Sequence, residues 1–153
     1  HPIAAVVTTE NIASSFNNGM EYFNSFGGNP VSCAVGKSVL EVIENKKLQE
    51  NALSVGKYFL NKLEKIKRKN KKYISEVRGR GLFIGIDIIK NSNQLKPNKQ
   101  LAKKIINFMK NKGILLSTDG PYDNVIKVKP PLVFNIQNVD SVCENLESFF
   151  KKI

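Results

Sequence analysis

The sequence around Ser25 combines groups that could hold a phosphate. The stretch EYFNSFGGNP places the Ser25 hydroxyl two residues before Gly27 and Gly28, and Asn29-Pro30 follows directly. Asn is a favoured N-cap and Pro suits the first helical position, so the stretch predicts the start of a helix. A hydroxyl and free amide groups near a helix start suit a dianion. Two interpretations stay open: a phosphate site, or a capped helix whose glycines allow close packing.

Two further segments place cations in patterned surroundings. The segment Arg78–Gly81, read as RGRG, lies beside a long apolar run and predicts a turn between strands, with its arginines in solvent. Lys127 lies within the β-branched stretch Val125–Val128, so it is a candidate for binding an anion from a strand. The alternative for Lys127 is an edge strand from which the lysine points to water.

Several common site chemistries lack the residues that they need. The single histidine is His1, and a terminal histidine has no surrounding residues to orient it in a Ser-His-Asp arrangement. Cys33 and Cys143 lie far apart and the carboxylates are scattered, so we expect no metal site. The Gly79–Gly81 segment lacks the lysine of a phosphate-binding P-loop. These patterns assign no catalytic residue to the chain.

The positive charge of the chain is concentrated in one segment. The formal net charge is +11, and residues 57–72 hold eight basic residues against one acid, Glu64, which supplies +7 of it. Phe59, Leu63 and Ile66 recur in that segment at helical spacing, so the lysines decorate the solvent face of a helix. A nucleic-acid-binding surface is the alternative, and it predicts an affinity that falls steeply with salt.

Composition limits the class of protein. At 153 residues and 41% hydrophobic content the chain can form one ordinary domain, or pieces of two, with a real core. No apolar run reaches the length of a membrane span, and the first residues lack the basic and long apolar regions of a secretory signal. Cys33 and Cys143 fall in apolar helical patterns, so we expect buried free thiols in a reducing compartment. We expect a cytoplasmic location, and a mitochondrial one stays open because the start, which lacks Met, indicates a longer protein.

The first half of the chain predicts one strand and three helices. The β-branched and uncharged residues Ile3–Thr8 predict a short buried strand, and Thr9 can cap the helix that follows. Long helices are predicted where Val, Leu and Ile recur every three or four residues. The expected helices are Glu10–Phe16, Pro30–Asn45 and Leu48–Asn70.

The second half predicts the order β-β-α-β-β-α. Strands are expected at Tyr73–Val77, Leu82–Ile89, Ile114–Ser117 and Asn124–Lys129, with Leu82–Ile89 as a central strand. A helix around Leu101–Met109 ends at Gly113, and a last helix starts near Asn135. The fold class is therefore α/β, with a small sheet backed by helices in an α+β arrangement from residue 73 onward.

Five segments together resemble one enzyme family. They are HPIAAVVTT, EYFNSFGGNPVSCAVG, LQENALSVGKYF, VRGRGLFIGIDI and GILLSTDGPYDNVIKVKPPLVF, and their order and spacing span the chain. The chain is thereby similar to the C-terminal portion of class III aminotransferases, which are pyridoxal-phosphate enzymes of fold type I. The likeness is strongest to the subgroup with ethanolamine-phosphate phospho-lyase and alanine-glyoxylate aminotransferase 2-like proteins. It implies that residues 1–46 end the large domain with a connecting helix and that residues 47–153 form the small domain.

The resemblance also implies a cofactor and a partner. It implies pyridoxal 5'-phosphate, and a homodimer formed through the large domain, with no nucleic acid or membrane partner. In the family a Thr hydroxyl before the Gly-Gly-Asn-Pro loop donates to the cofactor phosphate of the neighbouring subunit; Ser25 takes this position here, next to Phe26. The lysine that forms the Schiff base is expected upstream of His1, so the chain alone is expected to be inactive.

Lys127 departs from the family pattern in a way that bears on the substrate. Many members grip a substrate carboxylate with an Arg in an Ile-Arg-x-x-Pro-Pro pattern, whereas this sequence reads Ile126-Lys127-Val128-Lys129-Pro130-Pro131. A lysine lacks the bidentate fork of arginine. The resemblance implies transamination of a primary amine, with release of phosphate, ammonia and aldehyde from phosphoethanolamine as the alternative. A third possibility is a truncated relative that only dimerises.

Overall fold

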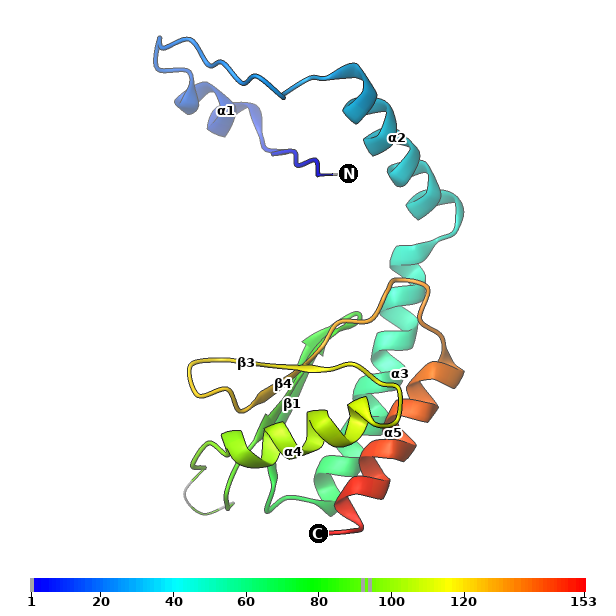
Figure 1. The fold of residues 1–153 in the computed structure, drawn as a ribbon. Coiled ribbons are helices and arrows are strands. Elements are labelled where there is room, and N and C mark those ends of the chain that lie inside the picture. The colour runs from blue at the N-terminus through cyan, green and yellow to red at the C-terminus, as the bar shows by residue number, and fades with distance from the viewer. Residues whose placement is uncertain (1, 92, 94) are drawn as a thin grey trace. The chain divides into compact units, whose positions relative to one another are not determined.

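The computed structural model describes residues 2–91, 93 and 95–153, so the His1 prediction lies outside the described residues. The chain divides into two compact units, His1–Lys46 and Lys47–Ile153. Each unit is described by itself below, with the element labels of Figure 1.

Unit 1 consists of two helices and long connecting segments. Helix α1 spans Glu10–Phe16 and helix α2 spans Pro30–Asn45, as the sequence predicts. Asn29 caps α2, because its side chain accepts a hydrogen bond from the Ser32 amide at 3.1 Å, and Pro30 takes the first position. Thr9 is at the N-cap of α1 but makes no side-chain cap bond. No residue of either helix is buried.

Two predictions for unit 1 are wrong. Residues 3–8 do not form a strand, and Val6 and Val7 are 93% and 94% exposed. A strand needs a ladder partner, and the described residues of unit 1 contain no other strand to pair with it. Cys33 is exposed rather than buried, because the apolar face of α2 has no layer packed over it within the unit.

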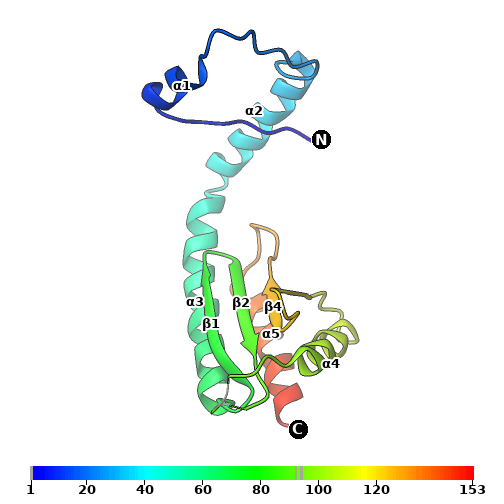
Figure 2. The same cartoon turned by 90° about the vertical axis from the view of Figure 1, so that its left-hand side faces the viewer.

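Unit 2 is a four-stranded antiparallel sheet packed against helices. In chain order it contains α3 (Leu48–Lys69), β1 (Ile74–Arg80), β2 (Phe83–Ile88), α4 (Lys99–Lys110), β3 (Ser117–Asp119), β4 (Val125–Val128) and α5 (Ile136–Phe150). The strand order in space is β1-β2-β4-β3. This confirms the predicted β-β-α-β-β-α order and the central position of β2. Figure 2 shows β1, β2 and β4 in front of α3 and α5.

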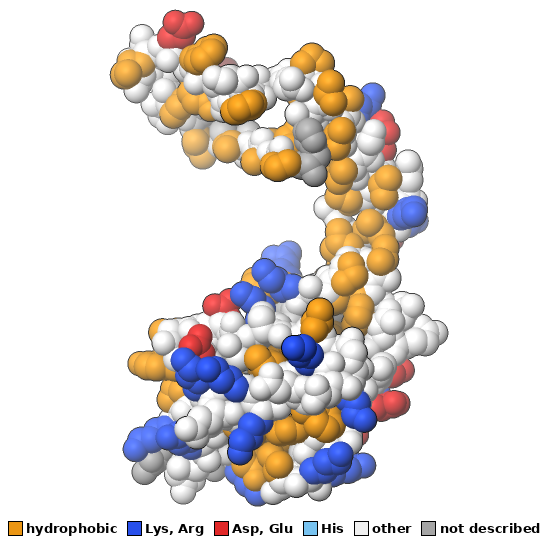
Figure 3. All heavy atoms as spheres, in the orientation of Figure 1, with side chains coloured by type: hydrophobic (Ala, Val, Ile, Leu, Met, Phe, Trp, Pro, Cys, Tyr) orange, Lys and Arg blue, Asp and Glu red, His pale blue; other side chains and the backbone are white. Residues whose placement is uncertain are grey.

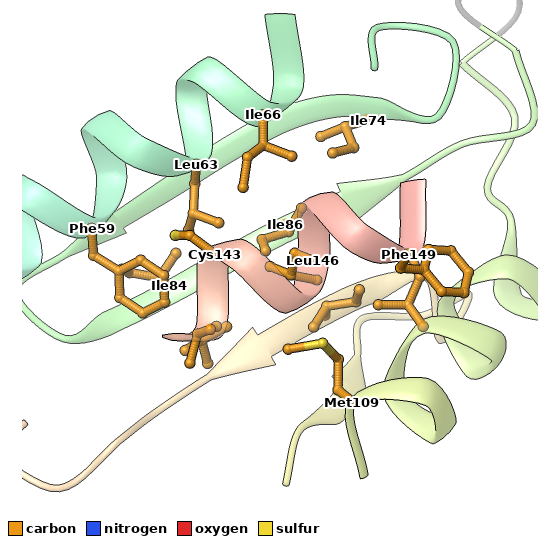
Figure 4. Packing of buried hydrophobic residues seen from close by; sticks show 14 of the residues in the cluster. Phe59, Leu63, Ile66, Ile74, Ile84, Ile86, Met109, Cys143, Leu146 and Phe149 are labelled. Carbon is orange, nitrogen blue, oxygen red and sulfur yellow. The ribbon is translucent and has the colours of Figure 1, made fainter. Parts of the chain in front are cut away.

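One core joins the sheet to the helices. Alternate residues of β2 are buried because Ile84, Ile86 and Ile88 point to the helices, while Phe83 points away. Helix α3 meets them with Val55, Phe59, Leu63 and Ile66, spaced at three or four residues. Helix α4 adds Leu101, Ala102, Ile105 and Met109, and α5 adds Val139, Val142, Cys143, Leu146, Phe149 and Phe150. Figure 4 shows part of this core, with Phe59 and Leu63 of α3, Ile84 and Ile86 of β2, and Cys143 and Leu146 of α5.

Capping residues fix the helix ends. Asn98 caps α4 by accepting from the Leu101 amide at 3.0 Å. Asn135 and Asn138 form a reciprocal capping box at the start of α5. Gly113 follows α4 with φ of +76°, the left-handed conformation predicted for it.

Two strand boundaries differ from the sequence prediction. The predicted turn Arg78–Gly81 is mostly strand, because Arg78 pairs with Gly85 and Arg80 with Phe83 in a tight hairpin. Only Gly81, with φ of +55°, stays in the turn. Strand β3 starts at Ser117 rather than at Ile114, because the Ile114 amide donates to the last turn of α4 at Met109.

Candidate functional site

The Ser25 loop of unit 1 is an exposed segment with a free hydroxyl. Ser25 is exposed, and within the part of the chain that the structure describes no hydrogen bond engages its hydroxyl. The amides of Phe26 and Gly27 both donate to Asn24 Oδ1, at 3.0 and 2.9 Å. The side chain of Asn24 therefore occupies the two amides after Ser25. The hydroxyl remains the loop's clearest donor toward an anion.

Apolar side chains surround this loop without cover inside the unit. Tyr22, Phe23 and Phe26 are 72%, 82% and 89% exposed. Val31 and Val39 continue the exposed apolar face along α2, where Figure 3 shows hydrophobic side chains gathered. A monomeric soluble domain rarely exposes such a contiguous patch. This face of unit 1 is therefore suited to being covered by other protein surface.

The face of the sheet that points away from the helices holds the cations predicted from the sequence. Because side chains alternate along a strand, Lys127 lies on the face opposite the buried Ile126 and Val128. Arg78 and Arg80 of β1 project from this same face, since Arg78 pairs with Gly85, and Gly85 pairs in turn with Lys127. We call this surface the open sheet face. The sheet thus brings together two segments that are far apart in the sequence.

A cleft of about 430 Å³ lies on the open sheet face. Its lining includes charged side chains and three glycines. These residues are Arg78, Gly79, Arg80, Phe83, Ile84, Gly85, Asp119, Gly120, Val125 and Lys127. A volume of this size is within the range of small-molecule sites.

Lys127 is held in the cleft by a carboxylate. Its Nζ donates to Asp119 Oδ2 at 2.6 Å, and the Lys127 side chain is 27% exposed. The Gly120 amide donates to Asp119 Oδ1 at 2.8 Å, so both carboxylate oxygens are engaged. The hydrogen bond from Lys127 and the Gly120 amide lower the pKa of the Asp119 carboxyl. The ammonium group therefore has a defined place rather than the free motion of a surface lysine.

The sequence identified Lys127 but missed Asp119. Asp119 lies beyond the predicted strand Ile114–Ser117, whereas in the structure it ends β3 and pairs with Val125 across the hairpin. One signal could have found it. Asp119 and Lys127 are eight residues apart and lie on either side of Gly120-Pro121, a turn sequence, which is the spacing expected of two facing strands. Gly85, which lies between Arg78 and Lys127, was also missed because it looks like an ordinary strand residue.

A second polar cluster lies between α3 and α5. Tyr58 and Lys62 both donate to Asp140 Oδ1 at 2.8 Å. These bonds lower the pKa of the Asp140 carboxyl, and the bond to Asp140 raises the pKa of both Tyr58 and Lys62. Burial raises the pKa of the nearby Cys143 thiol to about 12. The cluster ties α3 to α5 and is structural, and burial keeps the neighbouring thiol protonated.

Other site classes find no support among the described residues. No group of three or more His, Cys, Asp and Glu side chains in residues 2–91, 93 and 95–153 could hold a metal ion. Over the same residues no helix combines the length and apolar character needed to cross a membrane.

Comparison with known proteins identifies the family. The family model for aminotransferase class III matches residues 1–150. A Drosophila melanogaster protein named alanine–glyoxylate aminotransferase 2-like is 46% identical over 142 residues, which cover 92% of this chain and 28% of the relative. A Caenorhabditis elegans protein named ethanolamine-phosphate phospho-lyase homolog 1 is 40% identical over 139 residues, which cover 90% of this chain and 30% of the relative.

A solved structure agrees with these matches. A phospholyase from Arthrobacter, in complex with phosphoethanolamine, superimposes with a TM-score of 0.86 and 39% identity over 95% of this chain and 34% of that one. The chain thus spans about a third or less of the length of the proteins that it matches.

Proposed function

Because the chain belongs to the class III aminotransferase family, we propose that it is the C-terminal part of a pyridoxal-phosphate enzyme that transfers an amino group from a primary amine. The match of the family model to residues 1–150 carries this proposal. In the full-length enzyme, residues 1–46 end the large domain and residues 47–153 form the small domain. The Schiff-base lysine lies before His1, so the chain by itself is inactive. The enzyme is a cytoplasmic homodimer.

The Ser25 loop fits the phosphate of the cofactor. Pyridoxal phosphate, when bound, draws electrons from the substrate carbon that carries the amine and so allows that carbon to lose a proton. The exposed Ser25 hydroxyl donates a hydrogen bond to a phosphate oxygen of the cofactor in the partner subunit. Phe26, which is 89% exposed, is then covered when the two subunits meet. The exposed apolar face of unit 1 supports this placement.

Ser25→Ala tests this role directly. We expect the full-length variant to bind the cofactor about tenfold more weakly, since one charge-assisted hydrogen bond is lost. The measurement is a titration of the apoenzyme followed by cofactor absorbance. Ser54→Ala removes another exposed hydroxyl, one that bonds only to the Asn51 carbonyl, and serves as the matched control. Equal affinity in the Ser25 and Ser54 variants would show that Ser25 does not contact the phosphate.

Lys127 supplies the charge that binds the anionic group of the substrate. It lies in the cleft of the open sheet face and keeps hydrogen-bond donors beyond the one that it gives to Asp119. An ammonium attracts an anion as a point charge, without the planar fork with which arginine matches a carboxylate. This difference favours an anion other than a simple α-carboxylate.

The second candidate is therefore a phospho-lyase reaction, favoured by the lysine at position 127. A phosphate ester is a dianion that a point charge holds well. Two matched proteins also have phospho-lyase in their names, and one of these was solved with phosphoethanolamine. In this reaction the carbon–oxygen bond to phosphate breaks and one water molecule is consumed, because its oxygen becomes that of the aldehyde; phosphate, ammonia and aldehyde are the products.

Product analysis of the full-length protein decides between the two reactions. The reconstituted enzyme is incubated with phosphoethanolamine, with and without a keto-acid acceptor. Turnover that requires the acceptor supports transamination, whereas stoichiometric inorganic phosphate without it supports the lyase. Failure to bind pyridoxal phosphate would refute both. A steeply salt-dependent affinity for nucleic acid, without cofactor absorbance, would instead support the binding-module alternative.

A further inference from the structure

Helices α3 and α5 run in the same direction and are linked by two ion pairs. Lys62 Nζ donates to Asp140 Oδ1 at 2.8 Å, and Lys69 Nζ donates to Glu147 Oε1 at 3.2 Å. Both links join residues that are 78 positions apart, so the two helices advance in step. From one link to the next is about 10 Å, or two turns, along each helix.

A groove of about 410 Å³ lies between the two helices. Its floor is closed by Ile66 of α3 and Cys143 of α5, which are both 2% exposed. Its two rims carry opposite charge, since α3 contributes only cations and α5 only carboxylates among the charged residues that line it. These residues are Lys62, Lys65, Arg68 and Lys69 on α3, and Glu144 and Glu147 on α5. We call this surface the α3–α5 groove.

The charges in the middle of the α3–α5 groove are not paired with one another. Lys65, Arg68 and Glu144 are exposed, and none of them makes an ion pair with a described residue. By the step of 78 positions that the two links share, Glu144 lies level with Ile66, one residue after Lys65 and two before Arg68. Opposite charges thus flank the open groove, and their donors and acceptors are available to another molecule.

More positive charge lies where the two helices end. Both helices end at the same end of unit 2, as Figures 1 and 2 show. Lys71, Lys72, Lys151 and Lys152 follow the two helices, are exposed, and make no ion pair with a described residue. The C-terminus of a helix carries about half a negative charge, so the two helix ends offset only about one of these four charges. The surplus attracts an acidic molecule toward the α3–α5 groove.

The two rims select for the kind of partner. A nucleic-acid backbone that followed the groove would meet Glu144 and Glu147 along one side. Of the described residues that line the groove, none is aromatic, so the stacking surface typical of single-stranded nucleic-acid sites is missing. A polypeptide helix can carry carboxylates along one edge and cations along the other, and so complements both rims. Because the floor exposes little apolar surface, we expect weak and reversible binding.

We propose that the α3–α5 groove docks a helix of a partner protein that directs carboxylates toward Lys65 and Arg68 and a cation toward Glu144. The two ion pairs that link the helices hold the rims at a fixed separation. This interaction goes beyond the proposed function and does not rest on it, because none of these residues lies in unit 1 or on the open sheet face.

Binding of a designed peptide to the 153-residue chain tests the groove. The mixed peptide is a labelled helix of about four turns with glutamates along one edge and lysines along the other. The acidic peptide has the same length and glutamates along both edges. Fluorescence anisotropy is measured at about 0.1 M salt, where charges more than about 10 Å away are screened. We expect saturable binding of the mixed peptide and weaker binding of the acidic one.

Reversing one rim separates recognition by the groove from general attraction. Lys65→Glu combined with Arg68→Glu makes both rims acidic, so we expect the mixed peptide to bind about tenfold more weakly. Adding Glu144→Lys should restore binding, because the rims are again opposite and the helix can enter in the reverse direction. Lys103→Glu with Lys104→Glu makes the same charge change on exposed residues of α4 outside the groove, and is the matched control. Unchanged binding in the groove variant, or an equal loss in the control, would overturn the proposal.

Glu144→Gln tests the acidic rim with little change of shape. We expect it to weaken binding of the mixed peptide and to strengthen binding of the acidic peptide. Opposite changes with the two probes cannot come from a loss of folding. If both probes change in the same direction, or if the acidic peptide or an oligothymidylate of equal length binds the wild type more tightly than the mixed peptide, the surface is a general polyanion site and the proposal fails.

Discussion

The β1–β2 hairpin, which presents Arg78 and Arg80, is held against α3 by a contact between two glycines. Gly56 is buried in α3 and faces the backbone of Gly81 in the hairpin turn. A Cβ at Gly56 would lie 2.1 Å from the Gly81 carbonyl oxygen and 2.4 Å from the carbonyl carbon. The obstacle is backbone, so no side-chain rotation can relieve it. We predict that Gly56→Ala destabilises unit 2.

The magnitude follows from two opposing effects. Ordinary contact begins at 3.4 Å, so helix and hairpin must separate by about 1.3 Å to admit the methyl group. Overpacking of this kind costs about 3 kcal/mol at its upper end. Replacing glycine by alanine inside a helix returns about 1 kcal/mol of backbone entropy. We therefore expect a net loss of about 2 kcal/mol in the free energy of unfolding.

Urea denaturation followed by far-UV circular dichroism measures this loss. With a slope of about 2 kcal/mol per molar urea, the midpoint should fall by about 1 M. The matched control is Lys57→Ala, because Lys57 is the exposed neighbour on the same helix and should change the free energy by less than about 0.5 kcal/mol. A Gly56→Ala variant as stable as the wild type would show that the hairpin is free to move away from α3. The hairpin would then not hold its arginines in a fixed place.

Two further predictions concern thiol reactivity and acid stability. In the native chain Cys33 should react rapidly with a thiol reagent while Cys143, buried and with a pKa raised to about 12, reacts only after unfolding; two fast thiols would contradict the packing of α5. The bonds from Lys62 and Tyr58 lower the pKa of Asp140, so they stabilise the fold above about pH 4 and cease to do so as pH falls through the lowered pKa. Asp140→Asn should therefore lower the melting temperature at pH 7, by an amount that shrinks as the pH falls below about 4; a deficit that does not change with pH would rule this out.

The fold of unit 2 could be predicted because its local and tertiary signals agree. In α3 the spacing of Phe59, Leu63 and Ile66 marks one face, and that face is the buried one. In β2 a nearly continuous apolar run indicated a central strand, and β2 has a neighbour on each side. In the sequence Gly113 marked the end of α4, and the start of α5 was expected near Asn135. Each element satisfies its own propensity and the core at the same time.

The secondary-structure predictions fail where a segment's conformation depends on hydrogen bonds to a distant part of the chain. Residues 3–8 have strand composition, yet a strand forms only beside another strand, and composition does not say where that strand is. Arg78 and Arg80 look like turn residues because glycines flank them, but pairing with β2 makes them strand residues. The amide of Ile114 donates a hydrogen bond to the Met109 carbonyl at the end of α4, and β3 begins three residues later, at Ser117.

For the candidate site, too, the sequence predicts residues that stand in motifs and misses those that depend on strand pairing. Ser25, Phe26 and Lys127 were predicted as site residues because each stands in a motif, and the roles of Phe26 and Lys127 stay predictions. Nothing tests the Ser25 assignment directly, and it stays a prediction. Asp119 could not be assigned, because its role depends on the β3–β4 register that brings it within 2.6 Å of Lys127.

Net charge is a poor guide to the functional cations of this chain. The basic surplus is concentrated on α3, where Lys67 and Lys69 pair with glutamates and Lys62 pairs with Asp140. The open sheet face is closer to charge balance, since acids accompany Arg78 and Lys127. This balance of charge favours specific binding. A cation that is fixed by a carboxylate presents its donors in one direction, and it attracts polyanions less than an unpaired cation does. Lys57 and Lys65 of α3 have no such carboxylate partner among the described residues, so the cleft on the open sheet face is better suited to a small anion than they are.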